Sequence, residues 1–236
     1  MHLFPDLKCF YFEGNGVKKI EGFELNTKMM ALYIHENCIQ KMEGLDTMVE
    51  LRTLNLTDNM LTKVEGLSNL KKLDTLYLKR NRIGKNGTVE DLKGLLECPS
   101  ITCVDLSENA IDDEEVLPEI FEKMVDLKVL YLQGNPVTKK IKNYRKTLIA
   151  KLKNLTYLDD RPVFEDDRRY AEAYYKGGYD EERKERDVVK EEQRAKDKRN
   201  RDAFKDMMKK AREEKRLADE VKAAKAAEDK ENQPVN

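Results

Sequence analysis

A short apolar motif with an asparagine at a fixed place recurs along the first 137 residues of this 236-residue chain. In its clearest copy, residues 51–61 read LRTLNLTDNML, or L-x-x-L-x-L-x-x-N-x-L. The leucines at the first, fourth and sixth positions can point inward from one short strand and the bend leading into it. The asparagine amide can donate to and accept from backbone groups that a turn leaves unpaired. One such coil cannot bury its own apolar face, so it requires neighbours.

Matching copies lie on both sides of this one. Their asparagines are Asn15, Asn37, Asn59, Asn81, Asn109 and Asn135, which gives steps of 22, 22, 22, 28 and 26 residues. Six copies in register are typical of a leucine-rich repeat. The sequence therefore predicts an α/β solenoid, with a parallel β-sheet on the concave side and short helices or 3-10 turns on the convex side.

Amino-acid composition divides the chain into an N-terminal part rich in Leu, Ile and Phe and a C-terminal part dominated by charged residues. We assign residues 1–164 to a repeat domain of six repeats and a partial seventh that forms a C-terminal cap. Residues 165–179 are predicted to form a connecting helix, and residues 180–236 a charged helical tail with a disordered end. The first repeat begins so near the N-terminus that its apolar face needs cover from residues 3–5, from a partner or from sequence upstream.

The longer fourth and fifth steps should hold true α-helices. Thr88 is expected to cap a helix that runs to about Glu97. Asp112 and Glu115 resemble a capping box that opens a second helix. A further helix is expected to start at Asp166 and to end at the glycine pair 177–178.

The cap replaces the usual asparagine with a run of charged residues. We expect Asp159, Asp160 and Arg161 to satisfy the last open backbone groups of the solenoid, although a further role stays open. The residues assigned to the cap are Tyr144, Leu158, Asp159, Asp160 and Arg161.

Opposite charges recur three and four residues apart along the tail, which supports an isolated helix. Its apolar residues form two clusters, the first containing Phe204, Met207 and Met208, the second from Leu217 onward. These are too sparse for a coiled coil. Two interpretations remain: a solvated helix without a partner, and a helix that docks through Phe204, Met207 and Met208.

Catalytic chemistry finds little support. His2 and His35 are the only histidines, and no serine or cysteine is recognisably paired with either. The Gly14-Asn15-Gly16 run lacks the third glycine of a dinucleotide motif. The four cysteines have no metal-ligand spacing, and we expect reduced thiols. We predict no enzyme activity, no cofactor and no metal. A net charge of −1 and the lack of a long apolar run predict neither nucleic-acid nor membrane binding.

The outward strand positions predict a binding face. Tyrosine dominates the fifth motif position, and tyrosine carries binding energy at interfaces. The alternative is that these rings only pack on neighbouring strands. The residues assigned to this concave face are Tyr11, Tyr33, His35, Arg52, Asn55, Tyr77, Lys79, Asp105 and Tyr131.

Two groups of residues carry a family resemblance. The 22-residue repeats carry a Gly-Leu pair, at 44–45 and 66–67, in the segment that leads from one asparagine turn back to the next strand. These repeats resemble the SDS22-like class of leucine-rich repeats. Residues 134–137 (GNPV), 143–147 (NYRKT) and 155–164 (LTYLDDRPVF) resemble the dynein axonemal assembly factor 1 family, the leucine-rich-repeat factors for outer dynein arms. This resemblance covers roughly residues 7–195.

The resemblance implies a scaffold for the preassembly of axonemal dynein arms in the cytoplasm of ciliated cells. Its implied partners are axonemal dynein chains and co-chaperones, and the chain is expected to be a monomer outside these complexes. A second interpretation is a structural protein of the axoneme, bound to dynein or tubulin. A third, weaker one is a phosphatase regulator similar to SDS22.

Overall fold

The computed structural model describes residues 4–231, with side chains described as far as residue 220. The disordered end predicted for the tail therefore lies outside the described residues. The chain forms two compact units, residues 1–182 and residues 183–236, of which the structure describes residues 4–231. Within the part described, no helix has the length and apolar character needed to cross a membrane.

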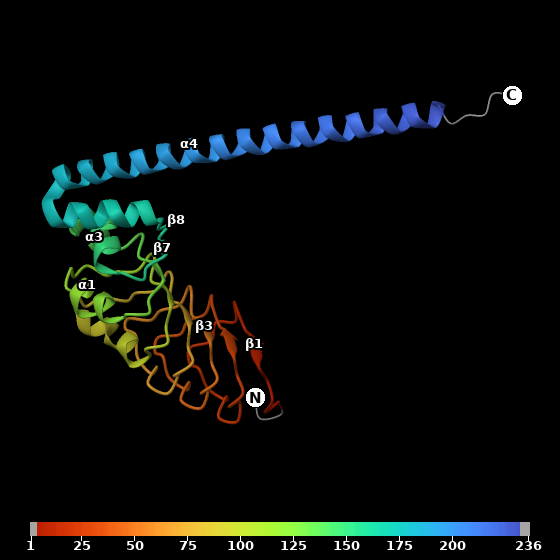
Figure 1. Ribbon diagram of the computed structural model, residues 1–236. Coiled ribbons are helices and arrows are strands. Elements are labelled where there is room, and N and C mark those ends of the chain that lie inside the picture. The colour runs from red at the N-terminus through yellow and green to blue at the C-terminus, as the bar shows by residue number, and fades with distance from the viewer. Residues whose placement is uncertain (1–3, 232–236) are drawn as a thin grey trace. The chain divides into compact units, whose positions relative to one another are not determined.

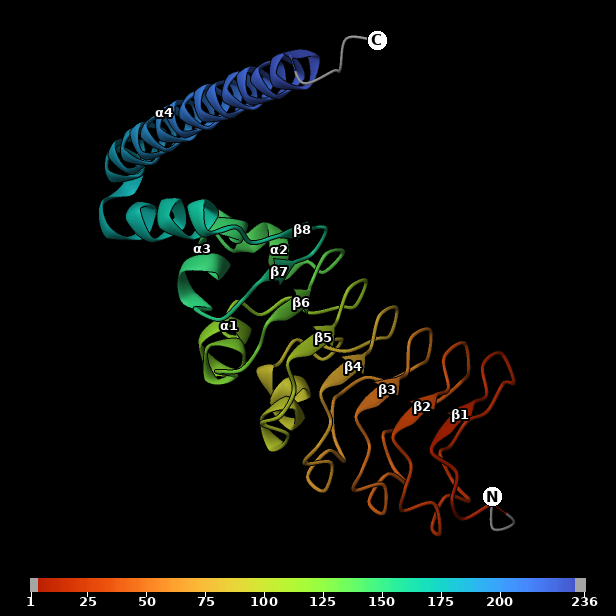
Figure 2. The same ribbon diagram turned by 45° about the vertical axis from the view of Figure 1, so that its right-hand side comes forward.

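The first unit is a stack of coils in which the strands line one side and the helices the other (Figures 1 and 2). Its eight strands form one sheet in sequence order. They are β1 (Cys9–Tyr11), β2 (Ala31–Tyr33), β3 (Thr53–Asn55), β4 (Thr75–Tyr77), β5 (Cys103–Asp105), β6 (Val129–Tyr131), β7 (Tyr157–Leu158) and β8 (Arg161–Pro162). The helices are η1 (Val89–Glu97), α1 (Val116–Glu119), η2 (Phe121–Lys123), α2 (Val137–Lys140), α3 (Tyr144–Lys151) and α4 (Glu165–Glu231).

The strand register repeats the sequence motif. Strands β1 to β7 are parallel, and their central apolar residues Phe10, Leu32, Leu54, Leu76, Val104 and Leu130 stand side by side. From Leu32 to Leu130 these side chains are completely buried. The solenoid fold predicted from the repeat is confirmed.

Each asparagine after Asn15 joins its coil to the preceding one. The Nδ2 of Asn81 donates to the carbonyl oxygens of Leu56 and Leu78 at 2.9 and 3.0 Å. Its Oδ1 accepts from the backbone N–H of Leu61 at 3.0 Å. Asn59, Asn109 and Asn135 repeat these bonds in their own coils. The amide therefore satisfies backbone groups that would otherwise be buried without partners.

Glycine in the segment that leads back to the next strand allows neighbouring coils to approach closely. Gly44 and Gly66 have φ of +71° and +72°, a region that favours glycine. A Cβ added at either would lie 2.1 Å from the Ile20 carbonyl oxygen or 2.6 Å from that of Met42. The close spacing of the coils therefore requires glycine at the first position of the Gly-Leu pair.

The helices of the two longer steps differ from the predicted ones. η1 is a 3-10 helix rather than an α-helix, and Thr88 makes no side-chain cap hydrogen bond. Gly94 presses the backbone of η1 against the preceding coil, since an added Cβ would lie 2.3 Å from the Val64 carbonyl oxygen. A narrower 3-10 helix suits this close contact.

The predicted capping box is also wrong. α1 has only four residues and no side-chain cap, and a 3-10 turn, η2, follows it. Asp112 instead forms an ion pair with Lys140 at 2.7 Å. The carboxylate of Asp113, not Asp112, accepts the backbone N–H of Glu115 at 3.0 Å.

The glycine pair interrupts a longer helix instead of ending it. α4 begins at Glu165, leaves helical geometry at Gly177 and Gly178, and then resumes. The ring of Tyr179 packs edge-on against that of Tyr174 at 5.0 Å, and Lys146 lies over both rings. Lys146 also pairs with the buried carboxylate of Glu182. These contacts hold the first turn after the kink on the repeat domain.

Candidate protein-binding face

The fifth motif position forms a continuous column across the sheet. Strand pairing places Tyr11, Tyr33, Asn55, Tyr77, Asp105 and Tyr131 side by side. Their side chains alternate with the buried central residues, so they point outward onto the concave face.

The tyrosines of this column are not equivalent. Tyr11 and Tyr33 stack with centroids 4.5 Å apart, and Tyr11 is 61% exposed. Tyr77 and Tyr131 are half-buried, and burial raises the pKa of both hydroxyls. All four offer amphipathic rings suited to a protein contact.

Two members of the column serve the fold. Asn55 Oδ1 accepts the backbone N–H of Thr57 at 3.0 Å, and Asp105 Oδ1 accepts that of Ser107 at 2.9 Å. Both side chains therefore turn back onto their own strand ends and close turns there. The tyrosine column is interrupted at these two places.

An ion-pair ladder lies beside the column, where the chain leaves each strand. Arg80 Nε and Nη2 each donate to the Asp58 carboxylate at 2.5 Å. In the neighbouring pair, Lys79 Nζ lies 2.9 Å from Glu108 Oε1. Glu36, Asp58, Arg80 and Glu108 all have φ near +55°, which positions their side chains along one rim.

His35 and Arg52 complete the predicted face. The Nδ1 atom of His35 is buried without a hydrogen-bond partner among the described residues. Arg52 is exposed, and its carbonyl oxygen accepts the backbone N–H groups of Asp74 and Thr75 at 2.9 Å each. Sequence reasoning placed these residues on the face but did not predict which of their neighbours would be paired.

The Asp58–Arg80 pair makes stability depend on pH. The hydrogen bonds from Arg80 lower the pKa of the Asp58 carboxyl below its ordinary value of 3.8. A lowered pKa in the folded state adds stability above the unfolded pKa, and this stability is lost as pH falls through the folded value. The Asp58 side chain is 26% exposed, so solvent limits the gain from its ionised form to about 1 kcal/mol.

We therefore predict that Asp58→Asn lowers the free energy of unfolding by about 1 kcal/mol at pH 7. The difference should shrink as pH falls below 3.8. Asparagine tolerates the φ of +54° at this position, so the change isolates the charge. Urea titrations across this pH range measure it, and a difference that stays constant would contradict the assignment.

The cap closes the solenoid with groups that the sequence only partly indicated. In inner coils, the N–H at the sixth motif position donates to the next strand, as Leu106 does to Tyr131. After β6 the next strand turns away, and Asp159 Oδ1 takes the N–H groups of Leu132 and Gln133 at 2.8 and 3.0 Å.

The other predicted cap residues act differently. The Asp160 and Arg161 side chains are exposed and pair loosely with each other at 3.8 Å. Among the described residues, neither side chain bonds to a backbone group of the solenoid. Leu158 is buried in the core. The Tyr144 hydroxyl is buried beside Asp159, and desolvation raises its pKa.

Two arginines that were not among the predicted cap residues hold the cap. Arg145 donates to the carbonyl oxygens of Leu158 and Pro162 at 3.1 and 2.7 Å. Arg168 donates to those of Ile149, Leu152 and Leu155 at 2.8, 3.2 and 2.5 Å. The carbonyls that Arg168 reaches lie in the last turn of α3 and just after it, where a helix leaves its acceptors unpaired. No local pattern marks either arginine, because their partners lie 13 or more residues away.

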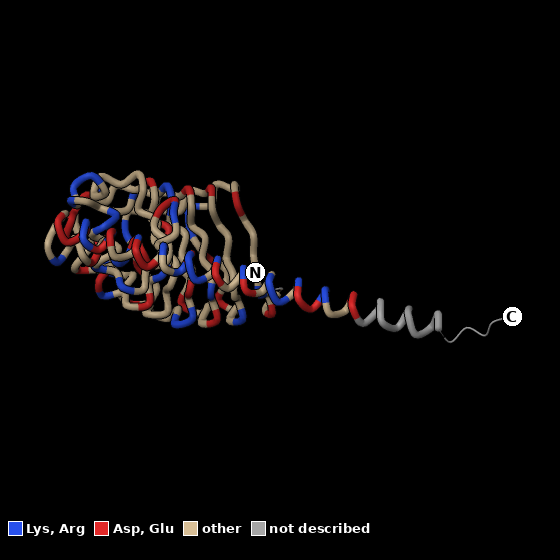
Figure 3. Tube along the Cα trace, turned by 45° about the horizontal axis from the view of Figure 1, so that its top comes forward, with Lys and Arg blue, Asp and Glu red and all other residues tan. Residues whose placement is uncertain are grey.

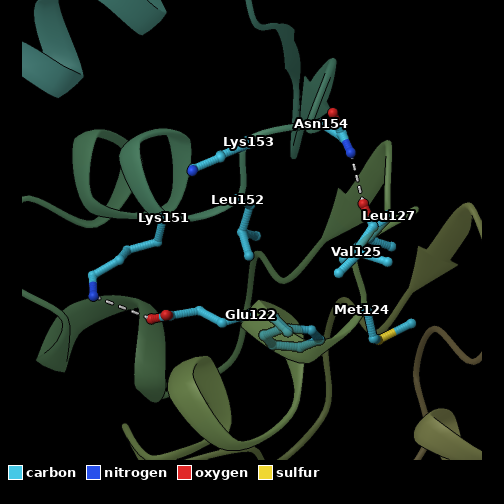
Figure 4. Close-up of a pocket in the computed structure, with 9 residues that line it drawn as sticks. Glu122, Met124, Val125, Leu127, Lys151, Leu152, Lys153 and Asn154 are labelled. Atoms are coloured by element: carbon cyan, nitrogen blue, oxygen red, sulfur yellow. Dashed lines mark hydrogen bonds and ion pairs between the residues drawn. The ribbon is translucent and has the colours of Figure 1, made fainter.

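Two pockets lie away from the concave face. One, of about 210 Å³, lies between η2 and the end of α3 (Figure 4). Its Lys151 and Glu122 side chains pair at 3.4 Å, and Asn154 donates to the Val125 carbonyl oxygen at 2.8 Å. The other, of about 270 Å³, opens beneath β1 between apolar side chains of the first two coils, including Phe10, Phe12 and Phe23. We assign no chemistry to either.

The thiols and carboxylates show no reactive arrangement within the described residues. Four cysteines are free, and desolvation raises the pKa of the Cys103 thiol to about 11. No group of three or more histidine, cysteine, aspartate or glutamate side chains able to hold a metal ion is found in residues 4–220. The tail residues Phe204, Met207 and Met208 are exposed on the second unit.

Comparisons with known proteins agree with this architecture. A leucine-rich repeat family model matches residues 46–191. An internalin from Listeria monocytogenes has a TM-score of 0.53 and 22% identity, over 66% of this chain and 48% of its own, and supports the fold alone.

Curated relatives match the predicted resemblance. Dynein axonemal assembly factor 1 from Homo sapiens is 42% identical over 148 residues, or 62% of this chain and 20% of its own length. The Mus musculus protein of that name is 54% identical over 96 residues, 41% of this chain and 15% of its own. Leucine-rich repeat-containing protein ODA7 from Chlamydomonas reinhardtii is 42% identical over 113 residues, 48% of this chain and 26% of its own. The chain thus spans only a minor part of each relative. It belongs to the leucine-rich repeat family and, within it, is similar to the dynein axonemal assembly factor 1 proteins.

Proposed function

We propose that this chain is a non-enzymatic, protein-binding scaffold that acts in the assembly of axonemal dynein arms. The names of its relatives support the process, and the concave face supports the mode of action. The observation that carries the proposal is the tyrosine column, in which exposed and half-buried rings stand beside a rim of paired charges.

The geometry suits recognition of a folded protein. Aromatic rings with a polar tip supply contact area, and the rim charges orient the partner. A rigid sheet presents these groups without the entropic cost of ordering a loop. The partners we propose are axonemal dynein chains and co-chaperones, bound in the cytoplasm of ciliated cells before the arms reach the axoneme.

Replacing Tyr33 and Tyr77 by alanine tests the face. We expect the double variant to lose at least about tenfold in affinity for a dynein chain, since buried interface tyrosines often contribute 2 kcal/mol or more. Its melting temperature should change little, because neither ring belongs to the buried core. Capture of dynein heavy and intermediate chains from ciliated-cell cytoplasm, followed by titration of the chain recovered, measures the effect.

Tyr175→Ala is the matched control, because Tyr175 is 56% exposed and lies on α4. It should capture dynein chains as the parent does. Equal capture by the double variant and the parent would refute the concave face as the binding site.

A further inference from the structure

A basic band occupies the middle of α4 and has no use in the proposed function. Residues 194–216 hold eleven lysines and arginines against five acidic residues, a net charge of +6 in a chain of net −1. Residues 217–231 return to net −2, with three lysines against five acidic residues. Figure 3 shows the charged residues along this helix. A local positive maximum favours an acidic partner.

An apolar stripe lies inside this band. Phe204, Met207, Met208 and Ala211 follow the i, i+3, i+4, i+7 spacing of one helical face. The three larger side chains are 59%, 58% and 40% exposed. This spacing is the pattern by which a helix anchors in an apolar groove.

A second apolar anchor stands on the other side of the helix. Leu217 is 50% exposed and follows Phe204 by thirteen residues. At 1.5 Å and 100° per residue, it lies about 20 Å further along and about 220° around the axis. Phe204 and Leu217 therefore point about 140° apart, so a narrow groove or flat surface centred on Phe204 does not receive Leu217.

We infer that residues 194–217 dock as a helix into a two-lobed acidic protein with a methionine-rich apolar pocket in each lobe. One pocket takes the stripe around Phe204, and the other takes Leu217. Methionine-rich pockets adapt to such irregular anchors, and acidic rims complement the basic band.

Other acidic partners fit the observations less well. A membrane surface requires apolar residues on one side of the helix, whereas Phe204 and Leu217 point about 140° apart. A nucleic acid or another simple polyanion would use the charge but leave both anchors in water. Only a partner that wraps around the helix uses both features.

Calcium-loaded calmodulin is a suitable probe, because calcium opens a methionine-rich groove in each of its acidic lobes. We expect the full chain to bind it one to one with a micromolar or tighter Kd in calorimetry, and to lose binding when EDTA removes calcium. Phe204→Ala and Leu217→Ala should each weaken binding at least about tenfold. Alanine favours the helix at both positions, so circular dichroism should show it intact.

Val188→Ala is the control, since Val188 is 44% exposed on the same helix outside the band. It should bind as the parent does. Lack of binding in calcium, or full affinity in Leu217→Ala, would overturn the inference. Binding only to phosphatidylserine-containing vesicles would overturn it in favour of a membrane surface. None of these outcomes depends on dynein arm assembly.

Discussion

Asn81→Ala should lower the free energy of unfolding of the repeat domain by about 3–4 kcal/mol. The substitution leaves the Leu61 N–H and the Leu56 and Leu78 carbonyls without their amide partner in a buried turn. Each buried group left unsatisfied costs about 1–3 kcal/mol, and the carbonyls share part of that cost with other donors. Urea denaturation followed by circular dichroism measures the loss.

Asn15→Ala is the matched control, because Asn15 occupies the same motif position in the first coil. It is exposed, and its amide makes one bond, to the Glu13 carbonyl oxygen at 2.7 Å. We expect a loss below about 1 kcal/mol. Equal losses at both positions would show that the amide serves its own turn and not the junction between coils.

Arg168→Ala should destabilise the cap by about 3 kcal/mol. Its guanidinium donates to three carbonyls in and just after the last turn of α3, and charged donors contribute about 1.5–3 kcal/mol per hydrogen bond, with incomplete additivity. Arg168→Lys should restore little, since an ammonium lacks the planar fork that reaches several acceptors. Hydrogen exchange should show lost protection concentrated in β6, β7 and α3.

Arg161→Ala provides the comparison. The Arg161 side chain is 65% exposed, and its Nε lies as far as 3.8 Å from the Asp160 carboxylate. Its removal should therefore lower the free energy of unfolding by less than about 0.5 kcal/mol. A larger effect at Arg161 than at Arg168 would contradict the assignment of the cap.

The repeat could be predicted from sequence because each coil obeys the same local rule. Buried residues, asparagine turns and glycine returns fall at fixed spacings, and Leu54, Asn59 and Gly66 each lie where that spacing requires. The helices in the two longer repeats, η1, α1 and η2, do not follow from a local spacing of this kind. η1 takes its 3-10 form through Gly94 against the preceding coil, a contact with residues about 30 positions earlier.

The position of the candidate face could be predicted from sequence, but the hydrogen bonds and ion pairs among its side chains could not. Alternation along a strand places Tyr33 and Tyr77 outward, and the register then brings them into one column. The same alternation cannot indicate that Asp105 turns back onto Ser107 or that Arg80 clamps Asp58. Those contacts depend on side-chain rotamers and neighbouring coils, as do the bonds of Arg168.

Fractionation of a ciliated cell that expresses the tagged chain tests the central proposal most directly. Cytoplasm, detergent-soluble cilia and extracted axonemes are separated, and dynein chains and chaperones are measured in each. A scaffold for dynein arm assembly should be recovered in the cytoplasm with dynein chains, and the Tyr33 and Tyr77 double variant should lose them. Recovery in extracted axonemes, with release only by salt, would contradict an assembly role and indicate a resident axonemal protein.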